Sequence, residues 1–376
     1  MNFSQRLLTF VPWAAVLSLG GVCQPTLFAG DPRMEDISLP PGFKISVYAE
    51  NVPNARGMSL GEDGTLYVGS REAGTVYALR DLDHDGHADT LFTIATKLNM
   101  PVGVAMHGGD LFVSSVDRIV KLPGIADHLA DPPSPVTVCT CFPDKDHHGW
   151  KYIAFGPDGK LYVPVGAPCN NCLSEDSIFA SITRMNPDGT GLEIIASGVR
   201  NSVGFDWDPK DSSLWFTDNG RDMLGDDIPN DELNHLAKEG AHFGYPFCHQ
   251  GDILDPEYGK GKSCADYTTP AVLLGPHVAA LGMKFYRGNM FPEKYRNAIF
   301  IAEHGSWNRT TPLGYRVAVA WPQPDGTAIT EIFAQGWLKG NTAWGRPVAL
   351  QELPDGSMLL SDDSADLIYR ITYSEE

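Results

Sequence analysis

Two adjacent histidines, His147 and His148, stand immediately before a predicted β-hairpin. Residues 152–155 are apolar, residues 156–159 have the turn sequence GPDG, and residues 161–163 are again β-prone. Histidine titrates nearer to neutral pH than other side chains, so a histidine at the rim of a strand suits proton transfer. The alternative is that both are surface loop residues, and the hairpin alone does not exclude it.

Residues 81–89 have the pattern D-x-D-x-D-G-x-x-D, with carboxylates at Asp81, Asp83, Asp85 and Asp89. Alternating carboxylates around a glycine turn supply the flexible set of oxygen ligands that Ca²⁺ prefers. The last ligand position of an EF-hand loop would need Glu and is Phe92 here, so the loop is not a complete EF-hand. We expect a structural calcium site, and the alternative is a solvated acidic turn.

A second acidic cluster occupies residues 218–232, where six of fifteen residues carry carboxylates. Carboxylates at this density repel one another unless a cation or an arginine compensates them. The cluster ends in Asp231 and Glu232, which we expect to contribute to a metal site.

These residues must be positioned by a repeat that occurs six times. Each copy has a strand, a turn rich in Gly, Pro or Asp, and a more hydrophobic strand, and several copies are followed by a third strand. The copies cover residues 57–70, 103–115, 152–166, 203–219, 281–305 and 347–363. An isolated meander cannot bury both faces, so six of them must pack around a ring. The sequence therefore predicts an all-β fold, a six-bladed β-propeller, as one domain over residues 31–376.

Segments outside the repeats complete this prediction. Residues 43–49 alternate like a strand without a repeat of its own, so we expect them to pair with residues 367–373 and close the ring. Residues 229–238 are expected to form a short helix. The second acidic cluster follows the central strand of the fourth repeat, which would fold it over the mouth of the central channel.

The repeats also predict which side chains converge. The innermost strand of every blade begins at the same face, so the residues just before the first repeat strands should meet there. They are Arg56, Asn99, His147, His148, Arg200, Asn201, His277, Trp344 and Arg346. This set indicates a polar, anion-binding pocket with a base. The alternative is a group of solvated loop residues that share only their position in the repeat.

Composition and charge narrow the class of protein. The chain has 376 residues, 43% of them hydrophobic, with 39 glycines and 28 prolines, which fits an ordered fold with many turns. The formal net charge of −19 disfavours nucleic acid and anionic membrane surfaces as partners.

The first 30 residues resemble a secretory signal peptide, with Arg6 followed by a mainly apolar stretch. The alternative, a membrane anchor, is disfavoured by Pro12 and by the short apolar run, and no later stretch predicts a membrane span. We therefore expect a secreted or periplasmic protein.

Six cysteines follow the signal region, and an even number in an exported chain predicts disulfides. Proximity favours Cys169 with Cys172 and Cys248 with Cys264. A zinc site is the alternative, although the spacing lacks the paired knuckles or histidines of such sites.

Several long motifs carry a resemblance to a known family. They include HHGWKYIAFGPDGKLYVPVGAPCNNC at residues 147–172, WFTDNGRDMLGDDIPNDELN at 215–234, IFIAEHGSWNR and AWGRPVAL. Together they resemble the sorbosone dehydrogenase-like branch of the soluble sugar dehydrogenases that depend on pyrroloquinoline quinone (PQQ). The resemblance covers most of the chain after the signal. It implies a six-bladed propeller with PQQ and Ca²⁺ at the channel mouth.

The resemblance also implies roles for individual residues. His148 matches the catalytic base, Arg200 a cofactor contact, Asn201 a residue at the quinone edge, and Arg346 a partner of the PQQ carboxylates. Cationic side chains suit a cofactor with three carboxylates, and Arg56 would join Arg200 and Arg346 in binding them. With Trp344 these residues form the predicted cofactor site.

The family binds the calcium ion of its cofactor partly through two successive main-chain carbonyls, which correspond to Gly220 and Arg221. The chain departs from the family pattern at three places. The carbonyl pair is Gly220-Arg221, where the family has Gly-Pro. Ala167 stands where the glucose-oxidising relatives have an aspartate, and the cofactor lysine has no clear counterpart near residues 303–309, where His304 or Arg309 could substitute.

The predicted function is therefore oxidation of a sugar, or of a sugar-derived aldehyde or alcohol, with PQQ and Ca²⁺ as cofactors and His148 as general base. The chain has no haem-binding motif, so electrons would leave to a separate acceptor. Two alternatives belong to other classes: a calcium-dependent propeller lactonase or other hydrolase, and a non-catalytic exported propeller that binds a ligand.

Overall fold

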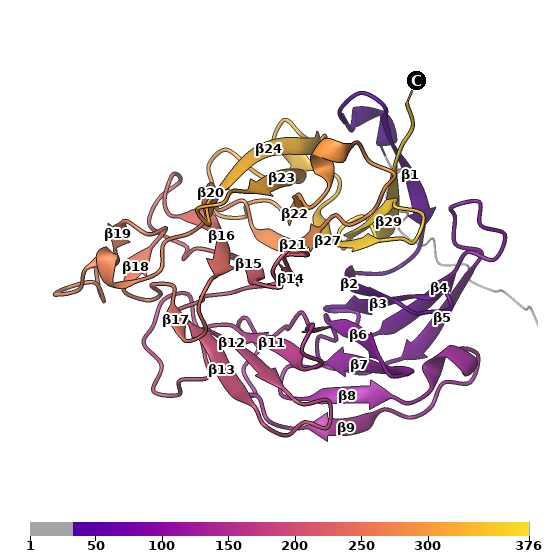
Figure 1. Ribbon diagram of the computed structural model, residues 1–376, viewed down its shortest axis with the longest axis horizontal. Coiled ribbons are helices and arrows are strands. Elements are labelled where there is room, and N and C mark those ends of the chain that lie inside the picture. The colour runs from indigo at the N-terminus through magenta and orange to yellow at the C-terminus, as the bar shows by residue number, and fades with distance from the viewer. Residues whose placement is uncertain (1–32, 376) are drawn as a thin grey trace, which may run out of the picture. The chain divides into compact units, whose positions relative to one another are not determined.

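The computed structural model of the chain describes residues 33–375, in which six sheets surround a central axis (Figure 1). The first blade contains β2 (Ala55–Leu60), β3 (Leu66–Ser70), β4 (Val76–Arg80) and β5 (Thr90–Ala95). The second contains β6 (Val104–His107), β7 (Asp110–Ser114), β8 (Ile119–Leu122) and β9 (Val136–Cys139). The third contains β10 (Ala154–Phe155), β11 (Leu161–Val165), β12 (Ser181–Met185), β13 (Glu193–Ser197) and a short parallel edge strand, β17 (Ala241–His242).

The other three blades follow the same order from the axis outward. The fourth contains β14 (Phe205–Trp207), β15 (Leu214–Asp218), β16 (Asn230–Leu236) and β20 (Val272–Pro276). The fifth contains β21 (Ala280–Phe285), β22 (Ile299–Glu303), β23 (Arg316–Pro322) and β24 (Ala328–Gln335). The sixth contains β27 (Pro347–Glu352), β28 (Met358–Asp362), β29 (Leu367–Tyr373) and β1 (Phe43–Ala49). The predicted all-β, six-bladed propeller is confirmed.

The ring is closed by β1, which pairs antiparallel with β29 as expected, from Phe43 opposite Tyr373 to Ala49 opposite Ile368. The Phe43 ring also packs edge-on against aromatic rings of the fifth blade. The closing strand therefore joins the last blade to its neighbour as well as completing its sheet.

Glycines at the start of the inner strands allow the blades to approach the axis. A Cβ atom on Gly57 would lie 2.5 Å from the main-chain oxygen of Val102, and one on Gly103 would lie 2.4 Å from that of Lys151. Such contacts are far inside van der Waals distance, so a side chain there would push neighbouring blades apart. This explains the glycine that begins several repeats.

The expected helix over residues 229–238 is wrong, because this segment contains β16. Its residues pair on one side with β15, where Glu232 faces Asp218, and on the other with β20. Two hydrogen-bonded ladders outweigh the weak helical preference of the segment. The helices within residues 33–375 are 3₁₀ turns of three residues, Met34–Asp36, Ile125–Asp127, Cys264–Asp266 and Glu293–Tyr295.

Three disulfides join the six cysteines of the described residues. Cys169–Cys172 and Cys248–Cys264 confirm the expected pairings, and Cys139–Cys141 is the third. Because the six cysteines of the described residues are in disulfides, they offer no thiolates to bind zinc. No helix of residues 33–375 has the length and hydrophobicity of a membrane span. The proposed signal peptide, residues 1–30, lies outside the described residues.

Candidate active site

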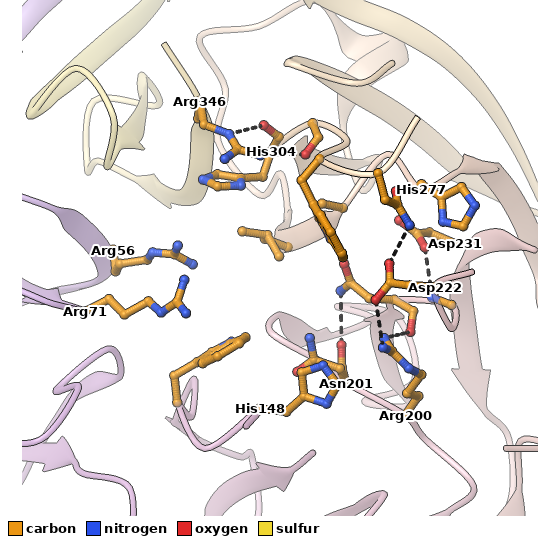
Figure 2. A pocket seen from close by; sticks show the side chains of 18 residues that line it. Arg56, Arg71, His148, Arg200, Asn201, Asp222, Asp231, His277, His304 and Arg346 are labelled. Atoms are coloured by element: carbon orange, nitrogen blue, oxygen red, sulfur yellow. Dashed lines mark hydrogen bonds and ion pairs between the residues drawn. The ribbon is translucent and has the colours of Figure 1, made fainter. Parts of the chain in front are cut away.

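A cavity of about 360 Å³ opens at the face where the inner strands begin (Figure 2). Second strands of the blades end at this same face, because they run antiparallel to the inner strands. The polar lining includes Arg56, Arg71, His148, Trp150, Arg200, Asn201, Asn219, Gly220, Asp222, Asp231, His277, His304, Trp307, Asn308 and Arg346. The structure thus brings together most of the side chains that the repeats predicted to converge.

His148 is buried in this lining, with Nδ1 2.9 Å from the main-chain oxygen of Ala167. A carbonyl oxygen only accepts hydrogen bonds, so Nδ1 carries a proton and Nε2 keeps its lone pair. Burial, followed by the charges of Arg200 and His147, lowers the pKa of His148 well below its usual range. His148 is therefore an oriented, neutral imidazole at pH 7.

Three residues that were predicted to converge lie outside the lining. His147 and Asn99 are exposed, and the Asn99 amide lies near Asp146. The Trp344 indole donates to the main-chain oxygen of Gly336 at 2.8 Å and stacks beside Trp337. The hairpin of β25 (Leu338–Lys339) and β26 (Thr342–Ala343), which immediately precedes Trp344, draws this residue into the packing at the edge of the last blade.

Arg56 and Arg71 reach into the cavity from one side (Figure 2). Arg56 is buried and pairs with Asp363 at 2.5 Å, and Arg71 lies over the Trp150 ring, 4.1 Å from its centre. Burial, with the nearby Arg56 charge second, lowers the pKa of Arg71. Its guanidinium still remains charged, because arginine titrates far above neutral pH.

Arg200 and Arg346 approach from the other sides of the cavity (Figure 2). Arg346 donates to the main-chain oxygens of His304, at 3.1 Å, and Gly305, at 2.6 Å. Arg200 is buried and lies 3.3 Å from the Asp222 carboxylate. Four guanidinium groups thus make the cavity suited to an anion with several acidic groups.

Several buried polar atoms of the lining residues have no hydrogen-bond partner. They are Nε of Arg56, Nε of Arg71, Nε1 of Trp150 and Oδ1 of Asn308. A buried polar atom without a partner costs about 1–3 kcal/mol. Their presence in one cavity indicates that a polar ligand completes the site.

His304 is a second buried histidine in the cavity, with Nε2 2.7 Å from the Asp363 carboxylate. Burial lowers the pKa of His304 to about 4, although Asp363 opposes this shift. Burial alone would raise the pKa of Asp363, but the charge of Arg56 and the contact with the His304 ring outweigh it and hold this pKa well below its usual range. The network therefore places a neutral imidazole, His304, in the lining of the cavity.

The predicted metal ligands of the second acidic cluster are divided. Gly220 and Asp231 line the cavity, and the Gly220 N–H donates to the Asp231 carboxylate at 2.8 Å. Burial raises the pKa of Asp231 to about 6. The Arg221 side chain turns away to pair with Asp255, and the buried Glu232 is not part of the lining.

The segment between β15 and β16, residues 219–229, borders the cavity, as the position of the insertion predicted. His277 holds this segment, with Nε2 2.9 Å from the main-chain oxygen of Gly225 and 3.1 Å from that of Ile228. Asn308 donates to the Asp222 carboxylate at 2.7 Å.

Several lining residues were not predicted, among them Arg71, Asn219 and Gly305, and His304 was named only as a substitute for the cofactor lysine. Arg71 follows β3, Asn219 follows β15, and His304 follows β22. The repeats contained the signal for them: an inner strand begins at the face where its antiparallel partner ends. Residues just after the second strands should therefore have been added to those before the first strands.

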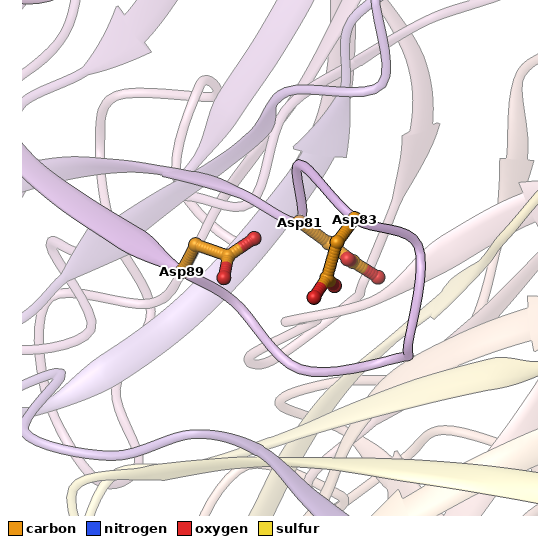
Figure 3. A group of neighbouring side chains, drawn as sticks. All are labelled: Asp81, Asp83 and Asp89. Carbon is orange, nitrogen blue, oxygen red and sulfur yellow. The ribbon is translucent and has the colours of Figure 1, made fainter.

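The 81–89 loop lies between β4 and β5, away from the cavity, since β4 runs in the same direction as β2 and ends at the other face (Figure 3). One carboxylate oxygen from each of Asp81, Asp83 and Asp89 lies within 4.8 Å of the others. Asp85 is outside this group and accepts the His87 N–H at 2.8 Å. The loop thus gathers three of the four predicted ligands.

The family model described as "Domain of unknown function (DUF7133)" matches residues 31–369. An uncharacterized protein of Borreliella burgdorferi is 33% identical over 356 residues, which are 90% of this chain and 91% of that protein. A pyrroloquinoline quinone-dependent pyranose dehydrogenase of Coprinopsis cinerea is 24% identical over 345 residues. That match covers 77% of this chain but only 45% of the longer relative.

Solved structures share the fold. The holo form of the pyranose dehydrogenase PQQ domain of Coprinopsis cinerea superposes with a TM-score of 0.76 at 20% identity, over 89% of this chain and 97% of the domain. A calcium structure of a Trichoderma reesei enzyme of carbohydrate-active family AA12 gives 0.78 at 20% identity, over 90% and 97%. At such identities the likeness concerns the propeller fold.

Proposed function

The chain belongs to the family described as a domain of unknown function, DUF7133, and we propose that it is an oxidoreductase that uses PQQ and Ca²⁺ to oxidise a sugar, or a sugar-derived aldehyde or alcohol. The observation that carries this proposal is the combination, in one cavity, of four arginines with a buried, neutral histidine. The C. cinerea pyranose dehydrogenase, a PQQ enzyme with 24% identity, supports the same cofactor.

The residues of the cavity fit PQQ, which carries three carboxylates. Arg56, Arg71 and Arg346 would bind these carboxylates, and the unpartnered Nε of Arg56 and Nε1 of Trp150 are donors for them. Arg200 and Asn201 would lie beside the quinone. The main-chain carbonyls of Gly220 and Arg221, with the Asp231 carboxylate, would supply oxygen ligands for Ca²⁺.

When bound, PQQ supplies a quinone that accepts hydride, and Ca²⁺ polarises it. The protein supplies the base. His148 accepts the proton of the substrate hydroxyl at Nε2, because Nδ1 is already protonated and bonded to Ala167. As the ring becomes positive, the Ala167 carbonyl stabilises it, in the place where the resembling glucose-oxidising enzymes have an aspartate. Burial keeps water from competing for the base.

The side chains at the rim of the cavity suit a sugar substrate. Trp307 lines the cavity and is 67% exposed, so a face of its indole is open to solvent. Exposed aromatic faces beside polar groups suit the apolar C–H face of a sugar ring. The side-chain oxygen Oδ1 of the neighbouring Asn308 has no hydrogen-bond partner. Aldoses and sorbosone are the first compounds to test.

The hydrolase alternative is disfavoured by the distribution of carboxylates. A calcium-dependent lactonase needs a cage of carboxylates or amides around a metal in the channel. Within residues 33–375, the group of three closely spaced acidic ligands is the 81–89 loop, away from the cavity. The cavity lining does contain Asp222, Asp231 and three asparagines, but Asp222 pairs with Arg200, and the four arginines favour an anion over a cage for a metal ion.

The setting of the reaction is also part of the proposal. Three disulfides favour an oxidising compartment, so we infer a secreted or periplasmic enzyme. Electrons would pass from the enzyme to a separate acceptor. We propose neither a nucleic acid partner nor a membrane-spanning segment.

The test is a titration of apoprotein with PQQ and Ca²⁺. We expect a bound quinone chromophore that is reduced on addition of an aldose, sorbosone or a sugar alcohol, and dye reduction at catalytic amounts of protein. Binding without reduction by any sugar would favour the ligand-binding alternative. Failure to bind PQQ would contradict the proposal.

A further inference from the structure

The four residues 169–172, Cys-Asn-Asn-Cys, form a turn closed by the Cys169–Cys172 disulfide, which we call the disulfide turn. It follows β11 on the side where the cavity lies. Neither Asn170 nor Asn171 lines the cavity. The turn nevertheless contacts two of the segments that build it.

Asn170 holds the Arg200 guanidinium by two hydrogen bonds. Nε of Arg200 donates to the Asn170 main-chain oxygen at 2.8 Å, and Nη2 donates to Oδ1 at 2.9 Å. The remaining nitrogen, Nη1, donates to the main-chain oxygen of Asn219 at 3.1 Å. The plane of the guanidinium is therefore set mainly by one residue of the turn.

The same asparagine holds the 219–229 segment. Its Oδ1 accepts the Asp222 N–H at 2.8 Å, and its Nδ2 donates to the Asp222 main-chain oxygen at 3.2 Å. One side chain thus joins Arg200 to the segment that carries Gly220 and Asp222.

The outer side of the turn is anchored independently. Asn171 donates to the buried Asp255 carboxylate at 3.1 Å, and the Cys172 N–H donates to the Tyr245 hydroxyl at 3.0 Å. Asp255 also pairs with Arg221. The turn is consequently fixed on both sides.

We propose that the disulfide turn is the positioning element of the anion site, with Asn170 as the positioning residue for Arg200 and for the 219–229 segment. The crosslink keeps the main-chain oxygen and the amide of Asn170 on the same guanidinium, because a closed four-residue turn has few alternative conformations. The identity of the anion as PQQ rests on the proposed function.

The test compares three variants with a matched control. Asn170→Ala removes the amide, Asn170→Asp keeps the acceptor oxygen for Arg200 and for the Asp222 N–H, and Cys169→Ser/Cys172→Ser opens the turn. The control, Cys139→Ser/Cys141→Ser, opens a disulfide at the end of β9 that does not line the cavity. The readouts are the PQQ dissociation constant in Ca²⁺ and hydrogen–deuterium exchange of residues 219–229.

Asn170→Ala and the opened turn should weaken PQQ binding at least about tenfold, since hydrogen bonds to a charged group are lost. Both should speed exchange in residues 219–229. Asn170→Asp keeps the acceptor for Arg200 but adds a negative charge beside it, so it should recover only part of the affinity. The control should match the parent in both readouts. Partial recovery by Asp, with a parent-like control, separates a positioning role from a general loss of structure. If the opened turn prevents folding, the two Asn170 variants decide.

Parent-like affinity and exchange in Asn170→Ala would overturn this inference, and so would an equal effect of the control. If the parent protein fails to bind PQQ, but exchange of residues 219–229 is faster in the variants as expected, the proposed function is contradicted. The positioning role of Asn170 would then still stand.

Discussion

His148 is the residue on which the proposed chemistry depends. His148→Gln keeps a hydrogen-bonding side chain of similar size but removes the base, so turnover should fall about 10²–10⁴-fold. PQQ binding should persist, since in the proposed site the arginines would bind the carboxylates. The measurement is dye-coupled sugar oxidation at saturating PQQ, with His147→Gln as the matched control at the exposed neighbour. A fast His148→Gln enzyme beside an inactive His147→Gln enzyme would exchange the two roles.

The pH dependence follows from the same residue. The base acts in its neutral form, and burial and Arg200 lower its pKa well below the ordinary histidine value. The rate should therefore be nearly constant above about pH 6.5 and fall only in more acidic solution. A rate of oxidation that rises through pH 7 to 8 would show that a different group accepts the proton.

Arg346 tests recognition of the anion separately from proton transfer. Arg346→Ala should weaken PQQ binding about tenfold or more, because a charge-assisted contact is lost and a carboxylate is left uncompensated. Arg346→Lys keeps the charge but not the planar pair of donors, so its affinity should be intermediate. Titration by fluorescence gives the dissociation constants. Equal affinities of parent and Arg346→Ala would remove Arg346 from the site.

At the scale of the element, the 81–89 loop should stabilise the first blade by binding Ca²⁺. At a calcium concentration 100 times the dissociation constant, binding should add about 2.7 kcal/mol to the free energy of unfolding. Thermal unfolding with and without a chelator measures this effect, and Asp83→Asn should reduce it. Ser46→Ala, on the exposed side of β1, is the control. An unchanged midpoint together with no calcium by elemental analysis would contradict the site.

β15 and β16 carry a second testable pair, Asp218 and Glu232, which face each other across the ladder. Burial, and then the Asp218 charge, raises the pKa of Glu232 to about 8. Because the pKa of Glu232 is raised in the folded protein, folding favours the protonated form of this side chain. The contribution of Glu232 to stability is therefore complete below about pH 4.5 and is lost as the pH rises through about 8. Glu232→Gln has no such loss, so its stability relative to the parent should increase with pH across this window.

Chemical denaturation of both proteins between pH 5 and pH 9 measures this difference. The same variant tests the predicted metal role of Glu232. If calcium binding at the cavity weakens in Glu232→Gln, this residue is a ligand despite lying outside the lining.

At the scale of the whole molecule, the ring depends on the closing strand. Phe43 packs against Phe291, Tyr295 and Phe333 of the fifth blade, with ring centres 4.8 to 5.3 Å away. Phe43→Ala should lower the free energy of unfolding by about 3 kcal/mol, because a buried ring is removed. Lys44→Ala, exposed on the same strand, should change it by less than about 0.5 kcal/mol. Equal unfolding curves for the two variants would show that closure does not limit stability.

The sequence by itself determined the propeller, its closure and six of the nine residues that were expected to converge at the cavity. Repeats fix these features because each strand–turn–strand unit needs neighbours on both faces, and the direction of the chain then fixes which ends of the strands meet. His148, Arg56, Arg200, Asn201 and Arg346 followed from that reasoning. The Cys169–Cys172 and Cys248–Cys264 disulfides could also be predicted from the sequence, because short separation along the chain limits the pairings.

Only the tertiary structure decided which of the converging residues face the cavity. Trp344 and Asn99 stand at the expected position of the repeat, but Trp344 packs beside Trp337 and Asn99 is exposed. Arg71 and His304 instead reach the cavity from the ends of second strands. The strand at residues 230–236 also depended on its two partners rather than on its own sequence. In each case the outcome depends on contacts between segments far apart in the chain, and local sequence preferences are too weak to specify such contacts.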